Sequence, residues 1–370
     1  MNDEVKVNSF KAWILASRPK TLAAAVAPVL VGAALGWRLE YCFSSHVADI
    51  TGAEAYVEMG FKSWFDCFMY FQIPSLMLAG MCLLFAVLMQ IDANFINDLY
   101  DYLKGTDGED RLGPKRAMAQ GWITKKAMYI GIAIVTALAC IVGLVMLYKL
   151  YMDIQATEVV SPWYQPTYNV LKTLCMVGVF SVLFAYSYTS GPFPLSYHGL
   201  GDVAVIAFFG HVAVYYTAYV MTYDELKSYS IPVFVGIAVG MVVDTLLIVN
   251  NYRDRDTDKR DGKNTLVAMF GEKFGRLFYL FIGIGAVVVM VYGLCNYTVN
   301  NMSRLIIALA YIPYIIVHSC NYVKLKQLRQ GKALNVLIGK SSMAMLLFAV
   351  ITVMLLLFVP DLVFEYSLVC

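Results

Sequence analysis

The chain reads Asn97-Asp98-Leu99-Tyr100-Asp101-Tyr102-Leu103-Lys104-Gly105-Thr106-Asp107 after a run, Ser75 to Ile91, that is apolar enough to lie within a bilayer. Carboxylates at the end of a membrane helix are costly to place, so we expect the three in this stretch to bind a cation. A second stretch of the same kind, Asn250-Asn251-Tyr252-Arg253-Asp254-Arg255-Asp256-Thr257-Asp258, follows another apolar run. One acidic cluster could be a solvated loop, but two clusters in matching settings indicate a site.

Composition is typical of an integral membrane protein. Of the 370 residues, 60% are hydrophobic and only 15% are charged, and the mean hydropathy is +0.65. The start, Met1-Asn2-Asp3-Glu4, leads to no short apolar core with a cleavage site, so we expect the first spanning helix to serve as the targeting signal. The eight cysteines show no C-x-x-C spacing and the four histidines are scattered, which argues against a disulfide framework or a Cys/His metal site.

A helix needs about 20 mostly apolar residues to cross a bilayer. On that criterion the sequence predicts an all-α polytopic membrane protein with about nine transmembrane helices, near 20–38, 75–96, 127–149, 169–187, 202–221, 231–251, 277–297, 304–322 and 342–364. Residues 10–18 suit a helix that lies in the interface, and Pro19 marks the turn into the membrane. We expect long external connections at 40–74 and 150–168, and an interfacial helix within the first of them.

Lys and Arg are concentrated in the connections that follow the second, sixth and eighth spans, whereas the odd-numbered connections contain few. The positive-inside rule therefore predicts a multi-pass protein of the inner (cytoplasmic) membrane, with its N-terminus and both acidic motifs in the cytoplasm. Asn97-Asp98-x-x-Asp101 also aligns with Asn250-Asn251-x-x-Asp254. This predicts one domain over 1–370 with two pseudo-repeat halves, motif 1 near 94–116 and motif 2 near 250–266, which meet at a shared pocket.

Spacing within the two motifs favours a magnesium site. Three pairs of oxygen-bearing residues are four apart, which puts each pair on one helical face: Asn97 and Asp101, Asn250 and Asp254, Asp254 and Asp258. Gly105 is expected to end the first helix, so that Asp107 returns from the loop, and Asp98 is adjacent to the metal face but not clearly on it. Oxygen ligands without His or Cys favour a hard cation such as Mg²⁺.

The ligand between the two motifs is expected to be anionic. Basic residues together with Mg²⁺ are how proteins hold a diphosphate, and Mg²⁺ shares its coordination shell with substrate phosphates. Because the motifs end membrane helices rich in Met and aromatic residues, a diphosphate carried on a lipid tail fits them. Ionisation of such a lipid would leave an allylic cation, which aromatic faces could stabilise.

Several further stretches between Ala16 and about Gly275 complete a pattern with the two motifs: Ser17-Arg18-Pro19-Lys20-Thr21-Leu22, Ala27-Pro28-Val29-Leu30-Val31-Gly32, Arg111-Leu112-Gly113-Pro114-Lys115-Arg116, Gly199-Leu200-Gly201-Asp202, Phe208-Phe209-Gly210 and Gly262-Lys263-Asn264-Thr265-Leu266. With this pattern the chain resembles the UbiA-type membrane prenyltransferases. The six-residue step from Asp101 to Asp107, GLGD at 199–202 and GKNTL at 262–266 look like the branch that acts on 1,4-dihydroxy-2-naphthoate in menaquinone synthesis. The long connection at 40–74 departs from a compact family member.

The resemblance implies nine helices around a central cavity and transfer of a polyprenyl group from polyprenyl diphosphate to 1,4-dihydroxy-2-naphthoate, with loss of CO₂ to give demethylmenaquinone. It implies Mg²⁺ on Asn97, Asp98, Asp101, Asp107, Asn250, Asp254 and Asp258. It also places Arg18, Lys104, Arg116 and Lys263 on the diphosphate. Asp101 and Asp254 are the strongest catalytic candidates, and Asp202, Tyr188 and Tyr197 are expected near the acceptor or the cation.

Other functions stay open at this point. The same chemistry could serve another aromatic acceptor, 4-hydroxybenzoate or homogentisate. A lipid phosphatidyltransferase would need a D-G-x-x-A-R-type motif, which Asp107-Gly108-Glu109-Asp110-Arg111 fails. A divalent-cation transporter would place its acids near the middle of the membrane, whereas these crowd at one interface. The expected partners are the two substrates and the bilayer, without nucleic acid, and the sequence leaves the oligomeric state open.

Overall fold

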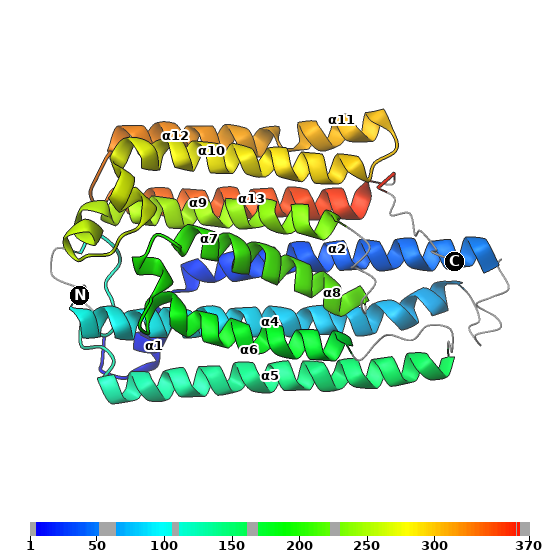
Figure 1. The fold of residues 1–370 in the computed structure, drawn as a ribbon, viewed down its shortest axis with the longest axis horizontal. Coiled ribbons are helices and arrows are strands. Elements are labelled where there is room, and N and C mark those ends of the chain that lie inside the picture. The colour runs from blue at the N-terminus through cyan, green and yellow to red at the C-terminus, as the bar shows by residue number, and fades with distance from the viewer. Residues whose placement is uncertain are drawn as a thin grey trace.

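The computed structural model describes residues 5–51, 64–105, 111–160, 169–222, 230–359 and 361–362. Within these residues the chain is a bundle of long helices that run along one common axis (Figure 1). The elements are α1 (Phe10–Ser17), α2 (Pro19–Thr51), α4 (Trp64–Lys104), α5 (Lys125–Val160), α6 (Asn169–Thr189), the 3₁₀ turn η1 (Leu195–Tyr197), α7 (Gly201–Val205), the π-helix η2 (Ile206–Tyr215), α8 (Tyr216–Thr222), α9 (Ile231–Arg260), α10 (Leu266–Asn296), α11 (Asn301–Ala310), α12 (Ile312–Leu328) and α13 (Leu334–Phe358).

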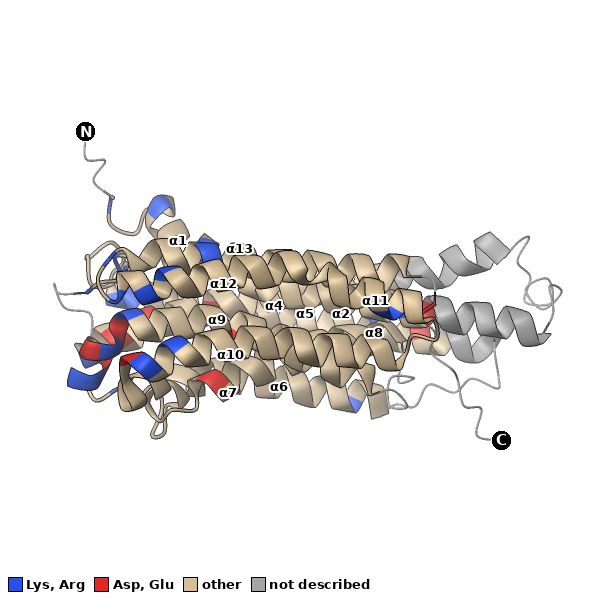
Figure 2. Ribbon diagram, turned by 90° about the horizontal axis from the view of Figure 1, so that it is seen from above, with Lys and Arg blue, Asp and Glu red and all other residues tan. Residues whose placement is uncertain are grey.

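The predicted membrane architecture is confirmed. Nine helical spans in the described part of the chain are long and apolar enough to cross a bilayer. The fifth span is built from α7, η2 and α8, and the eighth from α11 and α12. Charged side chains gather at one end of the bundle, where α4 and α9 finish, and the middle of the bundle is almost free of them (Figure 2). The protein is therefore a multi-pass membrane protein with one strongly charged end.

Several helices continue beyond the spans that hydropathy predicts. Helix α4 extends to Lys104 and α9 to Arg260, so both acidic motifs form the last turns of membrane helices. Gly105 ends α4 as predicted, with a φ of 71° that favours glycine. The loop expected at 150–168 is wrong in its first part, because α5 continues to Val160 and the ion pair of Lys149 with Asp153 lies within that helix.

Both ends of the long connection at 40–74 are helical. Helix α2 continues to Thr51 and α4 begins at Trp64, while residues 52–63 lie outside the described residues. The short helix expected before the first span is present as α1. It is capped by the Ser9 hydroxyl, which accepts the Ala12 N–H at 3.3 Å, and it is followed by Pro19 at the start of α2. The two pseudo-repeat halves stay a prediction.

Glycines bring the π-helix η2 into close contact with α9. A methyl group at Gly210 would lie 2.3 Å from the Gly236 carbonyl oxygen, and one at Gly240 would lie 2.5 Å from that of Ile206. These distances leave no space for a side chain, so the two backbones touch directly. This contact positions α7, which precedes η2, beside the part of α9 that carries the second acidic motif.

Candidate active site

A cavity of about 1060 Å³ lies at the charged end of the bundle. Its walls come from the α1–α2 junction, α4, the 111–116 segment, α6, η1, α7, α9 and α13. Towards the interior the wall is apolar, with Leu246 and Leu247 from α9 and Met343 and Leu346 from α13. The cavity therefore combines a charged mouth with an apolar interior, as expected for an amphipathic ligand.

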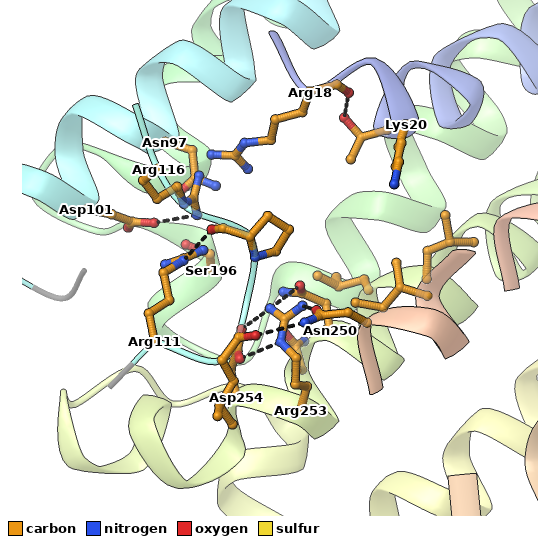
Figure 3. Close-up of a pocket in the computed structure, with 18 of the residues that line it drawn as sticks. Arg18, Lys20, Asn97, Asp101, Arg111, Arg116, Ser196, Asn250, Arg253 and Asp254 are labelled. Atoms are coloured by element: carbon orange, nitrogen blue, oxygen red, sulfur yellow. Dashed lines mark hydrogen bonds and ion pairs between the residues drawn. The ribbon is translucent and has the colours of Figure 1, made fainter. Parts of the chain in front are cut away.

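The first acidic motif is split between the cavity and the protein interior. Asn97 and Asp101, which share one helical face, both line the cavity, and the Arg116 guanidinium donates to Asp101 Oδ2 at 3.0 Å (Figure 3). Asp98 is 1% exposed and does not line the cavity; its Oδ2 accepts the Ala117 N–H at 3.1 Å. Asp98 thus fixes the 111–124 segment on α4, whereas Asp101 faces the ligand space. Asp107 lies outside the described residues.

The second acidic motif presents one face to the same cavity. Asn250, Asp254 and Asp258 all line it, as the four-residue spacing predicts. Asp256 points away, with its side chain 77% exposed. Asp258 Oδ2 has no hydrogen-bond donor among the described residues, and Oδ1 lies 4.0 Å from the Lys263 ammonium. Gly262, with φ 70°, turns the chain back so that Lys263 reaches this carboxylate.

Arg253 is buried beneath the second motif and organises it. Its Nε and Nη2 donate to the two Asp254 oxygens at 2.7 and 2.5 Å, and Nη2 also donates to Asn250 Oδ1 at 2.8 Å (Figure 3). Its Nη1 donates to Asn335 Oδ1 at 2.7 Å, and Asn335 in turn donates to the Leu112 carbonyl at 2.8 Å. One guanidinium thus links α9, the start of α13 and the segment after motif 1.

Three of the four predicted diphosphate contacts line the cavity: Arg18, Arg116 and Lys263. Arg18 is held at the α1–α2 junction, where Asn94 of α4 donates to the Ser17 carbonyl at 2.9 Å and to the Thr21 hydroxyl at 3.1 Å. The fourth, Lys104, is not among the lining residues. Its ammonium donates to the Thr189 carbonyl at 3.0 Å and lies 3.8 Å above the Tyr197 ring. Lys104 therefore supports Tyr197, which lines the cavity, rather than facing the ligand space itself.

A second group of polar side chains that line the cavity comes from α6, η1 and α7. Tyr188 of α6, Ser196 of η1 and Asp202 of α7 lie around Gly201, where a methyl group would be 3.4 Å from the Tyr188 hydroxyl and 3.9 Å from Ser196 Cα. The structure thus brings the predicted Asp202 and Tyr188 together at the same cavity as the acidic motifs.

The donor set suits Mg²⁺ that is shared with a phosphate ligand. Within the described residues, no three His, Cys, Asp or Glu side chains form a metal centre on their own. Mg²⁺ commonly takes one or two protein carboxylates and completes its shell with water and substrate phosphates. The carboxylates of Asp101, Asp254 and Asp258, with an unpartnered buried oxygen on Asp258, fit that mode of binding.

Comparison with known proteins places the chain in a family. The model of the UbiA prenyltransferase family matches residues 67–338, most of the chain. The chain belongs to the UbiA prenyltransferase family. It is 30% identical over 285 residues to the 1,4-dihydroxy-2-naphthoate octaprenyltransferase of Escherichia coli K12. The matched residues cover 77% of this chain and 77% of the relative. It is also 30% identical over 271 residues to the protein of that name from Mycobacterium tuberculosis, covering 73% of this chain and 74% of the relative.

A more distant relative is the UbiA prenyltransferase domain-containing protein 1 of Dictyostelium discoideum, 26% identical over 283 residues, which covers 75% of this chain and 69% of the relative. The UbiA chain described here is thus a membrane prenyltransferase, as the resemblance of its motifs predicts. Members of this family use a prenyl diphosphate and an aromatic acceptor.

Two residues of the UbiA site, Arg253 and Asn335, are not predicted as site residues from the sequence. Arg253 is one of many basic residues at the charged end, and Asn335 is an isolated amide 82 residues further on. The signal that could reveal Arg253 is its position within motif 2, between Asn250 and Asp254. No comparable signal marks Asn335.

Proposed function

We propose that this UbiA enzyme transfers a polyprenyl group from polyprenyl diphosphate to 1,4-dihydroxy-2-naphthoate in a Mg²⁺-dependent reaction, with loss of CO₂, giving demethylmenaquinone. The observation that carries the proposal is a single cavity that joins two acidic motifs, each paired with an arginine, to an apolar interior. The names of the relatives from Escherichia coli and Mycobacterium tuberculosis, both 1,4-dihydroxy-2-naphthoate octaprenyltransferases, support the naphthoate as acceptor.

The charged mouth would bind the diphosphate head. Arg18, Arg116 and Lys263 line it and would donate to phosphate oxygens, because guanidinium and ammonium groups are the donors that proteins use for this purpose. Asn97, Asp101, Asn250, Asp254 and Asp258 would hold Mg²⁺, which neutralises charge on the leaving diphosphate. The apolar wall formed by Leu246, Leu247, Met343 and Leu346 would receive the first part of the tail.

The acceptor side of the reaction needs a ring carbon next to the donor carbon that loses the diphosphate. As the new bond forms, the bond from the ring to the carboxylate breaks and its electron pair restores the aromatic ring, releasing CO₂. Tyr188 lines the cavity, where the face of its ring could stabilise the allylic cation.

The test is to incubate the purified protein in detergent or nanodiscs with Mg²⁺, a long polyprenyl diphosphate and carboxyl-labelled dihydroxynaphthoate. We expect labelled CO₂ and a prenylated quinol in equal amounts, and no product after chelation by EDTA. If the enzyme prenylates 4-hydroxybenzoate or homogentisate and does not react with the naphthoate, the proposed acceptor is wrong and the prenylated compound takes its place. Product formation that is unaffected by EDTA would remove Mg²⁺ from the proposal.

We also infer that the charged end faces the cytoplasm and that the enzyme lies in the inner membrane. The concentration of Lys and Arg at that end supports this orientation through the positive-inside rule (Figure 2). A single cysteine introduced at Lys125, in a cysteine-free background, should be protected from an impermeant thiol reagent in intact cells. A cysteine at Asn301, at the opposite end of the bundle, should react.

A further inference from the structure

The cavity contains a carboxylate that the diphosphate and metal roles leave unused. Asp202 is 2% exposed and lines the cavity, yet neither of its oxygens has a hydrogen-bond donor in the described part of the chain. The adjacent Ser196 hydroxyl is 6% exposed and is also without a partner among those residues. Such groups are rare because each unpaired polar atom costs about 1–3 kcal/mol when it is buried.

A second buried carboxylate lies behind the first. Asp244 of α9 is 0% exposed, and neither of its oxygens has a donor within the described residues. Helix α7 packs against α9 at this level, where a methyl group at Gly201 would be 3.7 Å from the Leu247 side chain, and Asp244 is close enough to Asp202 for their charges to interact. The close glycine contact between η2 and α9 fixes α7, which precedes η2, against α9.

Tyr188 of α6 is an ionisable neighbour of both carboxylates. Its hydroxyl lies beside Gly201, and Asp202 and Asp244 are both within electrostatic range of it. In the described structure neither carboxylate forms an ion pair with a Lys or Arg. A buried carboxylate without a hydrogen-bond donor or a cation is costly, so Asp202 has the capacity to accept hydrogen bonds from a ligand in the cavity.

We propose that Asp202, together with Ser196, binds the ring hydroxyl groups of the aromatic acceptor, and that Asp244 of α9 is a positioning residue that acts on the acceptor through Asp202. The inference rests on the proposed function, since it names the residues that hold the acceptor. A dihydroxy aromatic ring supplies the donors that the two buried groups lack. It would also lie beside Tyr188, which lines the same cavity next to Gly201.

In the same arrangement, Asp202 can accept the proton of a ring hydroxyl while the prenyl group is transferred. A ring hydroxyl gives its proton to the Asp202 carboxylate as the ring carbon bonds to the prenyl carbon, and the donor C–O bond breaks with its electron pair going to diphosphate. When CO₂ leaves, the electron pair of that bond restores the aromatic ring, and the proton returns from Asp202 to the ring oxygen. Asp202 thus binds this proton only during the reaction, and the overall reaction neither consumes nor releases it.

The site would also select its acceptor. A buried carboxylate that is matched to a hydroxyl discriminates strongly against a ligand that lacks the hydroxyl, because the carboxylate is then left unpaired. A methoxy analogue of the acceptor should therefore be a much poorer substrate for the natural enzyme. In a variant without the carboxylate, this preference for hydroxyl over methoxy should largely disappear.

The experiment compares Asp202→Asn, Asp244→Asn and Ser196→Ala with the natural enzyme, using separate KM values for donor and acceptor. The matched control is Asp92→Asn, a buried carboxylate of α4 that accepts the Thr136 hydroxyl at 2.9 Å and does not line the cavity. We expect the acceptor KM to rise at least tenfold in Asp202→Asn and about threefold in Ser196→Ala, from the usual strength of charged and neutral hydrogen bonds. The donor KM should stay within twofold.

For Asp244→Asn we expect a smaller rise in acceptor KM and a reduced hydroxyl-over-methoxy preference, which a loss of packing alone would not cause. An unchanged preference and acceptor KM in both Asp202→Asn and Asp244→Asn would overturn the inference, as would a change confined to the donor KM. If one aspartate variant does not fold, as judged by thermal unfolding, the inference is tested by two other results. These are the acceptor KM of Ser196→Ala and the preference of the natural enzyme for the hydroxyl over the methoxy acceptor, and an unchanged KM with no preference would overturn it. If the natural enzyme does not act on the naphthoate, the proposed function fails, and the same variants are then tested with the hydroxylated acceptor it does use.

Discussion

Arg253 donates to both carboxylate oxygens of Asp254, the next residue in the chain, at 2.7 and 2.5 Å. The guanidinium is almost completely buried, whereas the carboxylate keeps some contact with the cavity. Arg253 therefore determines which way Asp254 points, and it keeps a buried charge paired until a ligand arrives.

Replacement of Arg253 by Lys should greatly reduce turnover although the charge is kept. A lysine cannot contact Asp254, Asn250 and Asn335 at once, so Asp254 loses its fixed orientation. We expect kcat to fall about 10- to 100-fold, equivalent to about 1.4–2.8 kcal/mol. Arg276→Lys is the control, because Arg276 pairs with Glu272 one helical turn away near the surface, where such pairs contribute little. Equal activity of both variants would contradict the role of Arg253.

Gly113 is expected to tolerate no side chain. A methyl group there would lie 2.8 Å from Arg253 Nη2 and 3.2 Å from its Cζ, and the guanidinium cannot move away without breaking its hydrogen bonds. Gly113→Ala should thus lower turnover in the same way as Arg253→Lys, by about tenfold or more. Gly178→Ala should leave turnover unchanged, since the added methyl meets no neighbouring helix or side chain within 4 Å in the described structure. Steady-state kinetics on the two alanine variants checks this.

Substitutions at Asp98 and at Asp101 should affect different properties of the enzyme. Asp101→Asn should raise the Mg²⁺ concentration needed for half-maximal rate by about tenfold, because Asp101 lines the cavity and would lose its charge there. Asp98→Ala should leave that concentration within twofold but lower the melting temperature, because it removes the oxygen that accepts the Ala117 N–H. A large shift in Mg²⁺ requirement for Asp98→Ala would instead identify Asp98 as a metal ligand.

Asn335→Ala should weaken the link between α13 and the 111–116 segment. The substitution removes the hydrogen bond to the Leu112 carbonyl, worth about 1 kcal/mol, and the bond from the charged Arg253, worth about 1.5–3 kcal/mol. We expect a lower melting temperature in detergent and a several-fold higher donor KM. Asn301→Ala serves as the control, since Asn301 is exposed at the opposite end of the bundle. A donor KM that is the same in both variants would argue against the link.

The nine spans could be predicted from sequence because bilayer thickness sets a length that hydropathy measures directly. Their ends could not, because Asn97, Asp101, Asn250 and Asp254 are polar and so lower the hydropathy of helical turns that the backbone still continues. The four-residue spacing correctly puts Asn250, Asp254 and Asp258 on one face and Asp256 off it.

Other parts of the site depend on tertiary contacts that sequence spacing does not contain. Asp98 is predicted beside the metal face, and only the packing of the 111–124 segment shows that it binds a backbone N–H instead of facing the cavity. Lys104 is one turn from Asp101, yet its contact with the Thr189 carbonyl takes it off the cavity wall. Asn335 joins segments more than 200 residues apart, which no local pattern reveals.

The hydrogen bond between Asn335 and Leu112 has a consequence for how the enzyme is made. The ribosome releases the segment that contains Leu112 long before it releases α13, so Arg253 has no partner at Asn335 until the ninth span enters the membrane. The two acidic motifs can be inserted and folded into helices earlier, but the hydrogen bond of Arg253 to Asn335 forms last. A nascent chain that stalls before α13 would thus carry both motifs in the membrane without an assembled catalytic centre.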